Sequence, residues 1–152
     1  MNETSALTWV VKPFETLNNR ELYQILQLRS AIFVVEQACC YQDMDNKDFY
    51  AHHLMGWQGT DLVAYTRLFN RGIAYEEASI GRVVVAMHAR KEGLGRELME
   101  RSLQQIEQLF GKQAIKIGAQ FYLKRFYENL GFVQVSDVYL EDDIPHIYMI
   151  RA

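Results

Sequence analysis

The chain has 152 residues, the length of one domain built around a single hydrophobic core. Hydrophobic residues make up 49% and charged residues 23% of the sequence, close to the globular average, and no apolar stretch approaches the roughly 18 residues of a membrane span. A net charge of −3 argues against a nucleic-acid-binding surface, which needs clustered lysine and arginine. We therefore expect one soluble domain over residues 1–152 that binds neither nucleic acid nor a membrane.

Nothing in the sequence indicates export, a disulfide framework or a metal. The amino-terminal MNETSALTWVVK is acidic where a secretory signal is basic, and it lacks a long apolar region, so we expect a cytoplasmic protein. Cys39 and Cys40 are adjacent and cannot form an ordinary unstrained disulfide with each other. The four histidines have neither the i, i+4 pairing nor the Cys-x2-Cys partners of zinc sites, so no metal is expected.

The first predicted elements are a strand and a helix. Leu7 to Val11 has the pattern of a strand, and Asn18 with Glu21 three residues later resembles a capping box that opens a helix. The helix is expected to continue through Arg29, and the β-branched run Phe33 to Val35 leaves its end undefined.

A loop and a hairpin are predicted next. The segment Glu36 to Asp48 carries three aspartates without periodicity, which indicates a loop. Two β-rich runs, His52 to Trp57 and Leu62 to Phe69, flank Gln58-Gly59-Thr60-Asp61, a pattern typical of a hairpin. The nearly continuous apolar run Ile80 to Met87 predicts a strand that is buried on both faces at the centre of the sheet.

The helix that follows is marked by apolar residues at spacings of four, three and four. They are Met99, Leu103, Ile106 and Phe110, and Gly111 is placed to end the helix.

The carboxyl-terminal part predicts a strand, a helix and two strands. Ala114 to Ala119 is expected to be a strand, and Phe121 to Leu130 a helix with Gly131 just past its end. Phe132 to Val138 and His146 to Ile150 complete the set as strands. The order predicts an α/β (α+β) fold, a mixed sheet of about seven strands flanked by about three to four helices.

A glycine-containing loop joins the predicted central strand to the long helix. Backbone N–H groups at such a helix start have no intrahelical partners and lie at the positive end of the helix dipole, so they favour anions. Gly93 and Gly95 allow a phosphate to approach the main chain, and Arg90 and Arg96 add positive charge. We interpret the loop as a pyrophosphate site, although a helix start without a ligand is the alternative on these residues alone.

Two known nucleotide motifs do not fit this loop. A nucleotide-hydrolase P-loop needs Gly-Lys-Ser/Thr, whereas Arg96-Glu97 follows the second glycine. A dinucleotide-binding fingerprint needs a third glycine where this chain has Leu98.

The loop does match a third signature. Arg90-x-x-Gly93-x-Gly95 resembles the Arg/Gln-x-x-Gly-x-Gly/Ala signature of the GCN5-related N-acetyltransferases (GNAT), and FYENLGF at Phe126 to Phe132 is similar to their later Tyr-Glu-x-x-Gly-Phe segment. Two such segments in the right order are more specific than either alone. Nearly the whole chain resembles the ElaA-like subgroup of this family, through Leu28-Arg29-Ser30, Phe33 to Gln37, Ile80 to Val85, Ala119-Gln120 and Glu141 to His146.

This resemblance implies an acyl-CoA N-acyltransferase (GNAT) fold in which acetyl-CoA, as co-substrate, lies where two parallel strands splay apart. The residues expected to bind it are Val83, Val84, Val85, Arg90, Lys91, Glu92, Gly93, Leu94, Gly95 and Arg96. The implied activity is acetyl transfer to a primary amine of a small molecule or peptide, by a monomer or homodimer. A non-catalytic acyl-CoA-binding module is the alternative.

The resemblance also suggests a general acid. The family places a tyrosine at the position of Tyr127 with its hydroxyl near the thioester sulfur, and a phenol of pKa about 10 can give its proton to a departing thiolate. Tyr127 also lies on the apolar stripe of its predicted helix, where a core aromatic is the alternative. Glu36, Asp142 and His146 are candidates for taking the ammonium proton, although Glu36 could equally cap a turn and His146 could be a structural strand histidine.

Two arginines on predicted strands complete the set of charged candidates. Arg67 and Arg82 could anchor an acidic substrate group, but we favour pairing with Glu76, Glu77 or the aspartates of the run Asp43 to Asp48. We expect one ring of the His52-His53 pair to face inward and the other outward, because successive side chains of a strand alternate.

Overall fold

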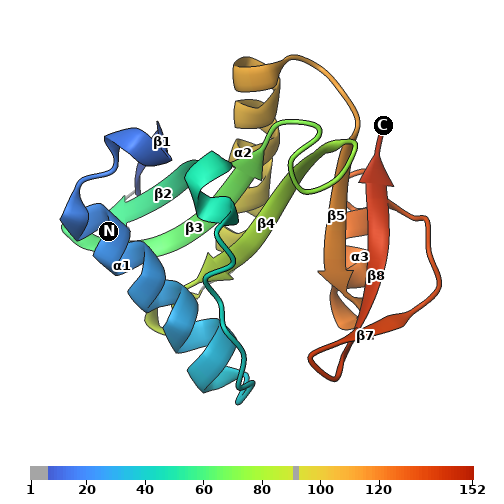
Figure 1. Cartoon of the computed structure of the whole chain (residues 1–152), viewed down its shortest axis with the longest axis horizontal. Coiled ribbons are helices and arrows are strands. Elements are labelled where there is room, and N and C mark those ends of the chain that lie inside the picture. The colour runs from blue at the N-terminus through green and yellow to red at the C-terminus, as the bar shows by residue number, and fades with distance from the viewer. Residues whose placement is uncertain (1–6, 91–92) are drawn as a thin grey trace.

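One twisted sheet runs through the molecule (Figure 1). The computed structural model describes residues 7–90 and 93–152. The strands in order are β1 (Thr8–Pro13), β2 (His52–Gln58), β3 (Asp61–Phe69), β4 (Ala78–Val85), β5 (Ile115–Gln120), β6 (Val133–Gln134), β7 (Tyr139–Glu141) and β8 (Ile144–Arg151). In space the eight-stranded sheet has the order β1-β2-β3-β4-β5-β8-β6, with β7 paired to β8. The strand β4 therefore lies at the centre, as predicted.

The pairing of the strands is mixed. The first four strands form an antiparallel meander, β4 and β5 are parallel, and β8 is antiparallel to β5, β6 and β7. The parallel step between β4 and β5 needs a crossover connection, and α2 (Leu94–Phe110) supplies it.

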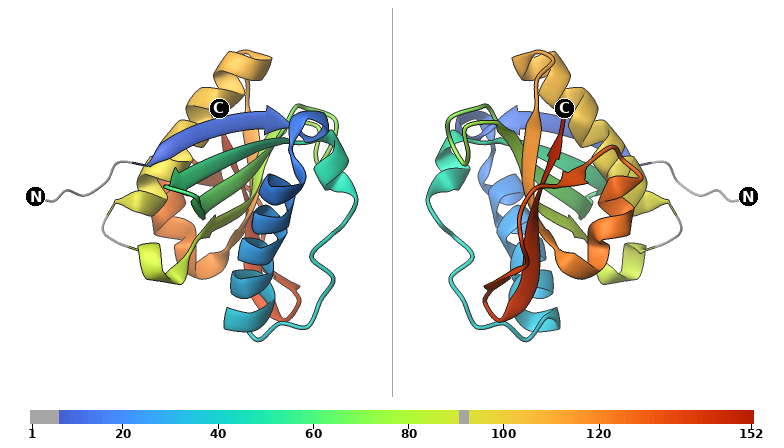
Figure 2. Two further views of the ribbon diagram at one scale, coloured as in Figure 1. Left: turned by 90° about the vertical axis from the view of Figure 1, so that its left-hand side faces the viewer. Right: turned by 90° about the vertical axis from the view of Figure 1, so that its right-hand side faces the viewer.

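The helices cover both faces of the sheet (Figure 2). The α-helices are α1 (Asn19–Arg29), α2 and α3 (Lys124–Glu128), and α1 continues directly into the π-helix η2 (Ser30–Glu36). Single 3-10 turns stand at η1 (Phe14–Thr16), η3 (Lys47–Tyr50), η4 (Met87–Ala89) and η5 (Phe121–Leu123). None of the helices in the described ranges is long and apolar enough to cross a membrane.

Adjacent residues of β3 show that α1 and α2 lie on opposite faces. The Thr66 hydroxyl is 2.8 Å from that of Ser102 on α2, whereas the ring of Tyr65 lies beneath the guanidinium of Arg29 on α1. Because side chains alternate along a strand, these contacts lie on the two sides of the sheet. One buried cluster accordingly joins the sheet to α2 and α3, and a second joins it to α1.

The predicted capping box at the start of α1 is confirmed. Glu21 N–H donates to Asn18 Oδ1 at 2.8 Å, and Asn18 N–H donates back to Glu21 Oε1 at 2.9 Å. The β-branched run after Arg29 does not end the helix but widens it, since Gln37 N–H donates to Ile32 O and Cys39 N–H to Val34 O, five residues back in each case. The widened turn places Glu36 beside the cavity that β4 and β5 line.

The long helix α2 also follows the prediction. Met99 and Ile106 are buried, and the helix ends at Gly111, whose φ of 89° requires the glycine. The strand before it begins and ends two residues earlier than predicted: β4 runs from Ala78 to Val85, and Met87 lies in η4 with 60% of its surface exposed.

The predicted helix Phe121 to Leu130 is correct only in its middle. The turn η5 occupies its start, and α3 has five residues. The helix ends two residues early, at Glu128, but the chain still turns at the predicted glycine: Gly131 has φ of 96°, and the amides of Gly131 and Phe132 donate to Glu128 O and Tyr127 O. These two bonds form a Schellman motif.

The predicted strand Phe132 to Val138 is mostly wrong. Val133–Gln134 pairs with β8 and the Val135 N–H still donates to the Tyr148 carbonyl at 2.9 Å, but the Ser136 hydroxyl then accepts the Tyr148 N–H at 2.9 Å in place of a backbone carbonyl. The chain leaves the sheet at this point and returns as β7, a strand that the sequence pattern did not predict.

Candidate functional site

The sheet opens between its two parallel strands. Residues of β4 and β5 pair only at Ala78 with Ile115 and at Ser79 with Lys116, near the start of each strand. Beyond these pairs the strands diverge, and both line a cavity of about 380 Å³. The opening lies between the face that carries α1 and the face that carries α3, since Phe33 of η2 and Tyr127 of α3 both line it.

A bulge in β4 lies beside this opening. Tyr65 pairs with Val84 and Arg67 with Gly81, so Arg82 and Val83 together face a single residue of β3. Arg82 has a φ of 50°, which is unusual for a residue other than glycine. A bulge leaves the extra residue out of the hydrogen-bonded ladder and redirects the strand, so the stretch Val83 to Val85 is turned along the opening.

The side chain of Arg82 holds the bulge in place. Its Nε donates to Asp43 Oδ1 at 2.8 Å and its Nη2 to the Asp43 carbonyl at 2.9 Å. These bonds attach the bulged strand to the loop that carries Asp43, Asp45 and Asp48, here called the aspartate-rich loop.

A second, mainly apolar cavity of about 300 Å³ adjoins the first. Gly95 of α2 and Phe126 of α3 line it, and it shares Val83, Arg90 and Tyr127 with the first cavity. The two cavities therefore meet at the end of β4, one on the side of α1 and the other on the side of α2 and α3.

The described part of the glycine loop forms the start of α2. Gly93 has φ of 88°, and its carbonyl accepts the first helical bond from the Glu97 N–H at 2.9 Å. The amides of Leu94, Gly95 and Arg96 precede this bond, so the helix itself gives them no acceptor. Lys91 and Glu92, which the sequence assigns to the same loop, lie outside the described residues.

Gly95 has no side chain, and the Arg96 side chain does not lie over the first turn of α2. A Cβ added at Gly95 would meet only the Phe126 ring, at 3.9 Å, so the glycine surface is open to the second cavity. The Arg96 side chain pairs along the helix with Glu100 at 3.1 Å and points away from the first turn.

Tyr127 lies where the two cavities meet. Its side chain is 6% exposed, and the rings of Phe126 and Phe132 pack edge-on against it with centroids 5.1 and 6.0 Å away. Burial raises the pKa of Tyr127 to about 12, and the neighbouring Tyr122 hydroxyl adds to the effect. The phenol is therefore protonated at neutral pH, and it is both a core aromatic and a wall of the cavities.

Glu36 and Arg90 form an ion pair across the mouth of the first cavity. The Arg90 Nη1 and Nη2 each donate to a Glu36 carboxylate oxygen at 2.7 Å. Hydrogen bonding from Arg90 lowers the pKa of Glu36, so the carboxylate is a weak base while the pair is intact. The third donor of the guanidinium, Nε, reaches the Val85 carbonyl at 3.2 Å.

Asp142 stands in the turn between β7 and β8. Asp142 and Asp143 have φ of 50° and 64°, the signs that a two-residue hairpin turn of type I′ requires. Aspartate tolerates this backbone better than most residues other than glycine. The turn brings Asp142 to the wall of the first cavity, where its carbonyl accepts from Cys39 Sγ at 3.8 Å.

His146 follows on β8 and lines the same wall. Its Nδ1 lies 2.7 Å from the Ile144 carbonyl, and because a carbonyl oxygen only accepts, Nδ1 carries the hydrogen. In the neutral ring Nε2 is then the bare nitrogen, able to take a proton. Tyr139 stacks on the ring with centroids 5.8 Å apart and fixes its orientation.

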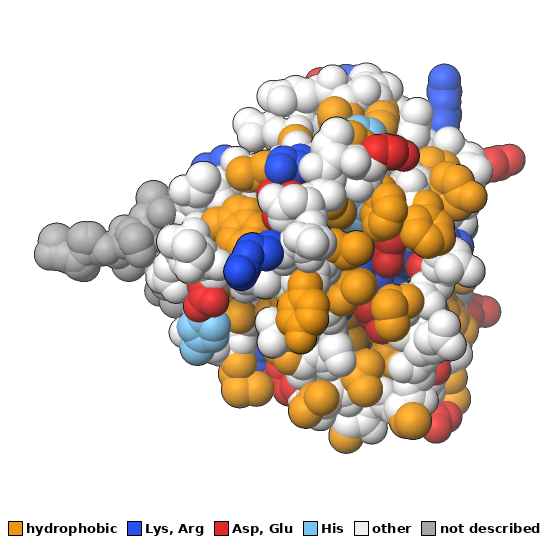
Figure 3. All heavy atoms as spheres, turned by 60° about the vertical axis from the view of Figure 1, so that its left-hand side comes forward, with side chains coloured by type: hydrophobic (Ala, Val, Ile, Leu, Met, Phe, Trp, Pro, Cys, Tyr) orange, Lys and Arg blue, Asp and Glu red, His pale blue; other side chains and the backbone are white. Residues whose placement is uncertain are grey.

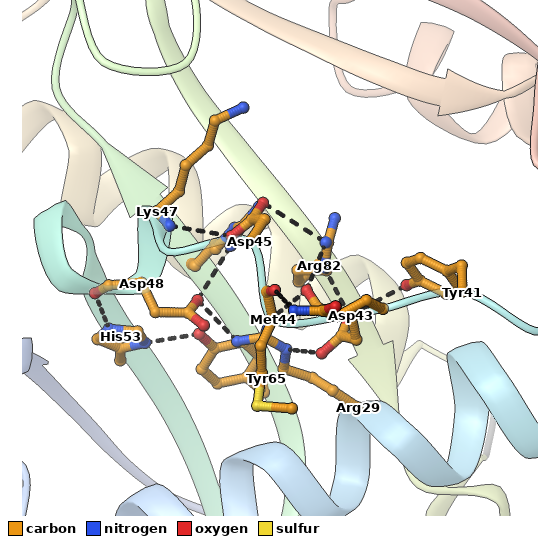
Figure 4. A network of polar contacts seen from close by, with 12 residues as sticks. Arg29, Tyr41, Asp43, Met44, Asp45, Lys47, Asp48, His53, Tyr65 and Arg82 are labelled. Atoms are coloured by element: carbon orange, nitrogen blue, oxygen red, sulfur yellow. Dashed lines mark hydrogen bonds and ion pairs between the residues drawn. The ribbon is translucent and has the colours of Figure 1, made fainter.

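The aspartate-rich loop is held by a buried network of charges (Figure 4). Arg29 donates to Asp43 and Asp48 at 2.8 Å each, and Arg67 donates to Asp45 and Asp48 at 2.6 and 3.0 Å. The prediction that Arg67 and Arg82 pair with the aspartates of the run Asp43 to Asp48 is confirmed. Arg29 was expected at the end of the first helix and in the Leu28-Arg29-Ser30 segment, but its pairing was not predicted, and its fully buried guanidinium is the centre of the network.

The network borders the first cavity through Tyr41, which lines it and donates to Asp43 Oδ1 at 3.0 Å. In the space-filling view, acidic and basic side chains are seen together in a recess between hydrophobic ones (Figure 3). The adjacent histidines alternate as predicted: His53 is fully buried, with Tyr65 and Asp48 as hydrogen-bond partners. The ring of His52 is not directed outward but is half-buried on the other face, 5.3 Å from the Phe110 ring of α2.

The cavities thus bring together most of the residues singled out from the sequence. Glu36, Val83, Val84, Val85, Arg90, Tyr127, Asp142 and His146 line the first cavity, and Leu94 and Gly95 line the second. Tyr41, Tyr122 and Glu141 line the first cavity without having been predicted. Within the described ranges, no group of three or more His, Cys, Asp or Glu side chains could hold a metal ion.

Known proteins share this arrangement. A family model described as an acetyltransferase (GNAT) domain matches residues 22–152. The ElaA protein of Escherichia coli strain K12 is 40% identical over 147 residues, covering 95% of this chain and 96% of its own. The crystal structure of Escherichia coli ElaA has a TM-score of 0.89 over 95% of this chain and 99% of that one.

Two further solved structures are similar. An acyl-CoA N-acyltransferase from Pseudomonas aeruginosa is 47% identical, with a TM-score of 0.93 over 97% of this chain and 100% of that one. An aminoglycoside 6′-N-acetyltransferase complexed with coenzyme A shares the fold alone, at 18% identity and a TM-score of 0.67 over 93% of this chain and 96% of that one.

The fold is therefore that of the acyl-CoA N-acyltransferases, a mixed α+β sheet with helices on both faces. The chain belongs to the GNAT family of acetyltransferases, among its ElaA-like members. The family and the fold expected from the two sequence segments are confirmed.

Proposed function

We propose that the protein is an N-acetyltransferase that moves the acetyl group of acetyl-CoA to a primary amine of a small molecule or peptide. The observation that carries the proposal is the position of Tyr127, a buried and protonated phenol where the two cavities meet. Family membership supports the acetyl group, and the similar fold solved with coenzyme A supports the cofactor.

Acetyl-CoA would lie along the end of β4. The bulge at Arg82 turns the backbone of Val83 to Val85 along the opening, where its groups can pair with the amides of the pantetheine arm. The free amides of Leu94, Gly95 and Arg96 would hold the pyrophosphate at the positive end of α2. The thioester then reaches the junction of the cavities, next to Tyr127.

The acceptor amine would enter from the first cavity, on the α1 side. Its nitrogen attacks the thioester carbonyl, a carbon–nitrogen bond forms, and the carbon–sulfur bond breaks with its electron pair going to sulfur. Negative charge develops on the carbonyl oxygen, which backbone N–H groups near Val83 to Val85 would stabilise, and then on sulfur. The Tyr127 hydroxyl donates a hydrogen bond and its proton to this sulfur, and the proton released by the reacting nitrogen restores the phenol.

A base is needed because a protonated amine has no lone pair with which to attack. We propose His146 for this role, since its Nε2 is the bare nitrogen of a ring fixed by Ile144 and Tyr139. Glu36 is neutralised by Arg90, and Asp142 lies in an exposed turn, so neither is placed as well in the ligand-free protein. A single-domain, cytoplasmic monomer or homodimer stays a prediction.

The test is a calorimetric titration with acetyl-CoA followed by an assay of free thiol release with a panel of primary amines. Tight binding with amine-dependent thiol release is the expected result. Binding without release for any amine would favour a non-catalytic acyl-CoA-binding module. Absence of binding would overturn both functions.

A further inference from the structure

Arg90 occupies the boundary between the two cavities. It comes from the end of η4, lines both cavities, and uses all three guanidinium nitrogens within the site. Two of them hold Glu36, which lies 54 residues earlier in the chain on η2, and the third holds the Val85 carbonyl. The side chain therefore ties the acceptor side of the opening to the end of β4.

Arg90 is the cation best placed to leave its partner. Its side chain is 43% exposed and that of Glu36 is 31% exposed, and an ion pair with this exposure to water contributes little to stability. Arg82, the other arginine of the first cavity, is fixed by Asp43 and also lies within 3.5 Å of Asp45. Arg82 thus belongs to the buried network, whereas Arg90 has one carboxylate partner among the described residues.

A phosphate is the stronger competitor for this guanidinium. Arginine binds phosphate through two parallel hydrogen bonds, in the same geometry that it uses with a carboxylate. Arg90 lies three residues before Gly93, next to the helix start that would hold the pyrophosphate. Its Nε also donates a hydrogen bond to the Val85 carbonyl, on the stretch of β4 along which the pantetheine arm would lie.

We propose that Arg90 exchanges partners when acetyl-CoA binds, moving from Glu36 to the pyrophosphate, and that the released Glu36 carboxylate then holds the ammonium group of the acceptor. This inference rests on the proposed function and adds an order to it. The cofactor binds first, and the acceptor cavity gains a free anion only afterwards. Glu36 thereby acts as a positioning residue, which delivers the amine to the base and the thioester.

The other acids of the cavity cannot provide this coupling. Within residues 7–90 and 93–152, Glu141 and Asp142 have no cationic partner in the structure, so their charge is the same before and after the cofactor binds. Among the acids that the structure describes in this cavity, only Glu36 has its charge neutralised by a residue next to the proposed phosphate site. Glu141 is therefore a matched control, an acid of the same cavity without such a partner.

The experiment compares binding of acetyl-CoA and of S-acetylpantetheine, which lacks the pyrophosphate, to the wild type, Glu36→Gln and Glu141→Gln by calorimetry. We expect Glu36→Gln to bind acetyl-CoA roughly two- to fivefold more tightly than the wild type, because Arg90 no longer has a pair to break. Glu141→Gln changes the net charge equally and should give a clearly smaller gain. S-acetylpantetheine should bind Glu36→Gln and the wild type alike.

A crystal structure with coenzyme A supplies the direct readout. The expected result is the Arg90 guanidinium within hydrogen-bond distance of a phosphate oxygen and no longer paired with Glu36. An intact pair in that complex, or equal or weaker binding of acetyl-CoA by Glu36→Gln, would overturn the exchange and leave the proposed function standing. No binding of acetyl-CoA by the wild type would remove the proposed function and the exchange together.

Discussion

Arg29 Nη1 donates a hydrogen bond of 2.8 Å to Asp48 Oδ1, with the arginine side chain fully buried. The pair joins α1 to the end of a loop that has little regular structure, and Arg67 shares the same carboxylate at 3.0 Å. Because the loop supplies Tyr41 to the wall of the first cavity, this buried pair connects the stability of the fold to the shape of the candidate acceptor site.

Removing the shared carboxylate should be strongly destabilising. In Asp48→Asn both Arg29 and Arg67 keep their positive charges in a buried place with one anion fewer. Breaking a buried ion pair in this way costs about 3 kcal/mol or more. The control is urea unfolding of Asp61→Asn. The Asp61 side chain is 71% exposed, and its ion pair is a long one, 3.8 Å from the exposed His88. The free energy of unfolding should fall by less than about 0.5 kcal/mol in this variant. Equal losses in the two variants would contradict a structural role for the network.

Stability should fall in two steps as the pH is lowered. Burial lowers the pKa of His53 in the folded protein, so the imidazole takes up a proton more readily in the unfolded chain. Stability is therefore lost as the pH drops below the pKa of histidine in the unfolded chain, about 6.5. Burial alone would raise the pKa of Asp48, but hydrogen bonds and charge from Arg29 and Arg67 lower it. Its contribution is present above the unfolded value of about 3.9 and is lost as the pH falls through the folded pKa.

The measurement for this pH dependence is urea unfolding at intervals from pH 7.5 to about pH 3. In His53→Gln the decline between about pH 7 and 5 should become shallower. It should not vanish, because burial also lowers the pKa of His52. A wild-type stability that is constant over that interval would show that His53 titrates alike in the folded and unfolded chains.

The regular elements could be predicted where local pattern and tertiary environment agree. The apolar stripe of Met99 and Ile106 and the Asn18 to Glu21 capping box are consequences of spacing within one turn or a few turns. The interruption of the predicted strand after Gln134 depends instead on the Ser136 hydroxyl replacing a carbonyl of its neighbour. A serine hydroxyl finds such a partner only after the strands are assembled, so periodicity does not reveal it.

The candidate site shows the same division. The glycine loop and the Tyr127 segment are continuous in sequence, and a motif locates them. The pair between Glu36 and Arg90 joins residues 54 positions apart, and it forms because a π-helical turn and the 3-10 turn after β4 meet at the opening of the sheet. Nothing in the spacing of either residue indicates the other, which is why the masking of Glu36 could not be predicted.

A negative charge at the start of α2 should weaken acetyl-CoA binding without harming the fold. Asp and Glu near a helix amino terminus are favourable for the helix, and a Cβ at Gly95 has room beside Phe126, so Gly95→Asp should unfold at the same denaturant concentration as the wild type or higher. Repulsion of the pyrophosphate should weaken acetyl-CoA binding roughly tenfold or more. Gly93 is less suitable, because its φ of 88° would strain any replacement.

The neutral control for this change is Gly95→Asn, which has nearly the same shape as the aspartate. We expect calorimetry to show a much smaller loss for asparagine than for aspartate. Similar losses in both variants would mean that the side chain blocks the groove and that the charge at the helix start has little effect. Unchanged binding in both would place the pyrophosphate elsewhere.

Tyr127→Phe should separate catalysis from binding. The ring packs against Phe126 and Phe132, and phenylalanine keeps these contacts, so stability and acetyl-CoA affinity should change little. Loss of the proton donor should reduce the rate of thiol release about a hundredfold or more at saturating amine. Tyr122→Phe removes a hydroxyl from the same cavity, but from a largely exposed ring, and should have a much smaller effect. A Tyr127→Phe rate within a factor of about three of the wild type would be too small a change for a general acid, and would leave Tyr127 as a core aromatic.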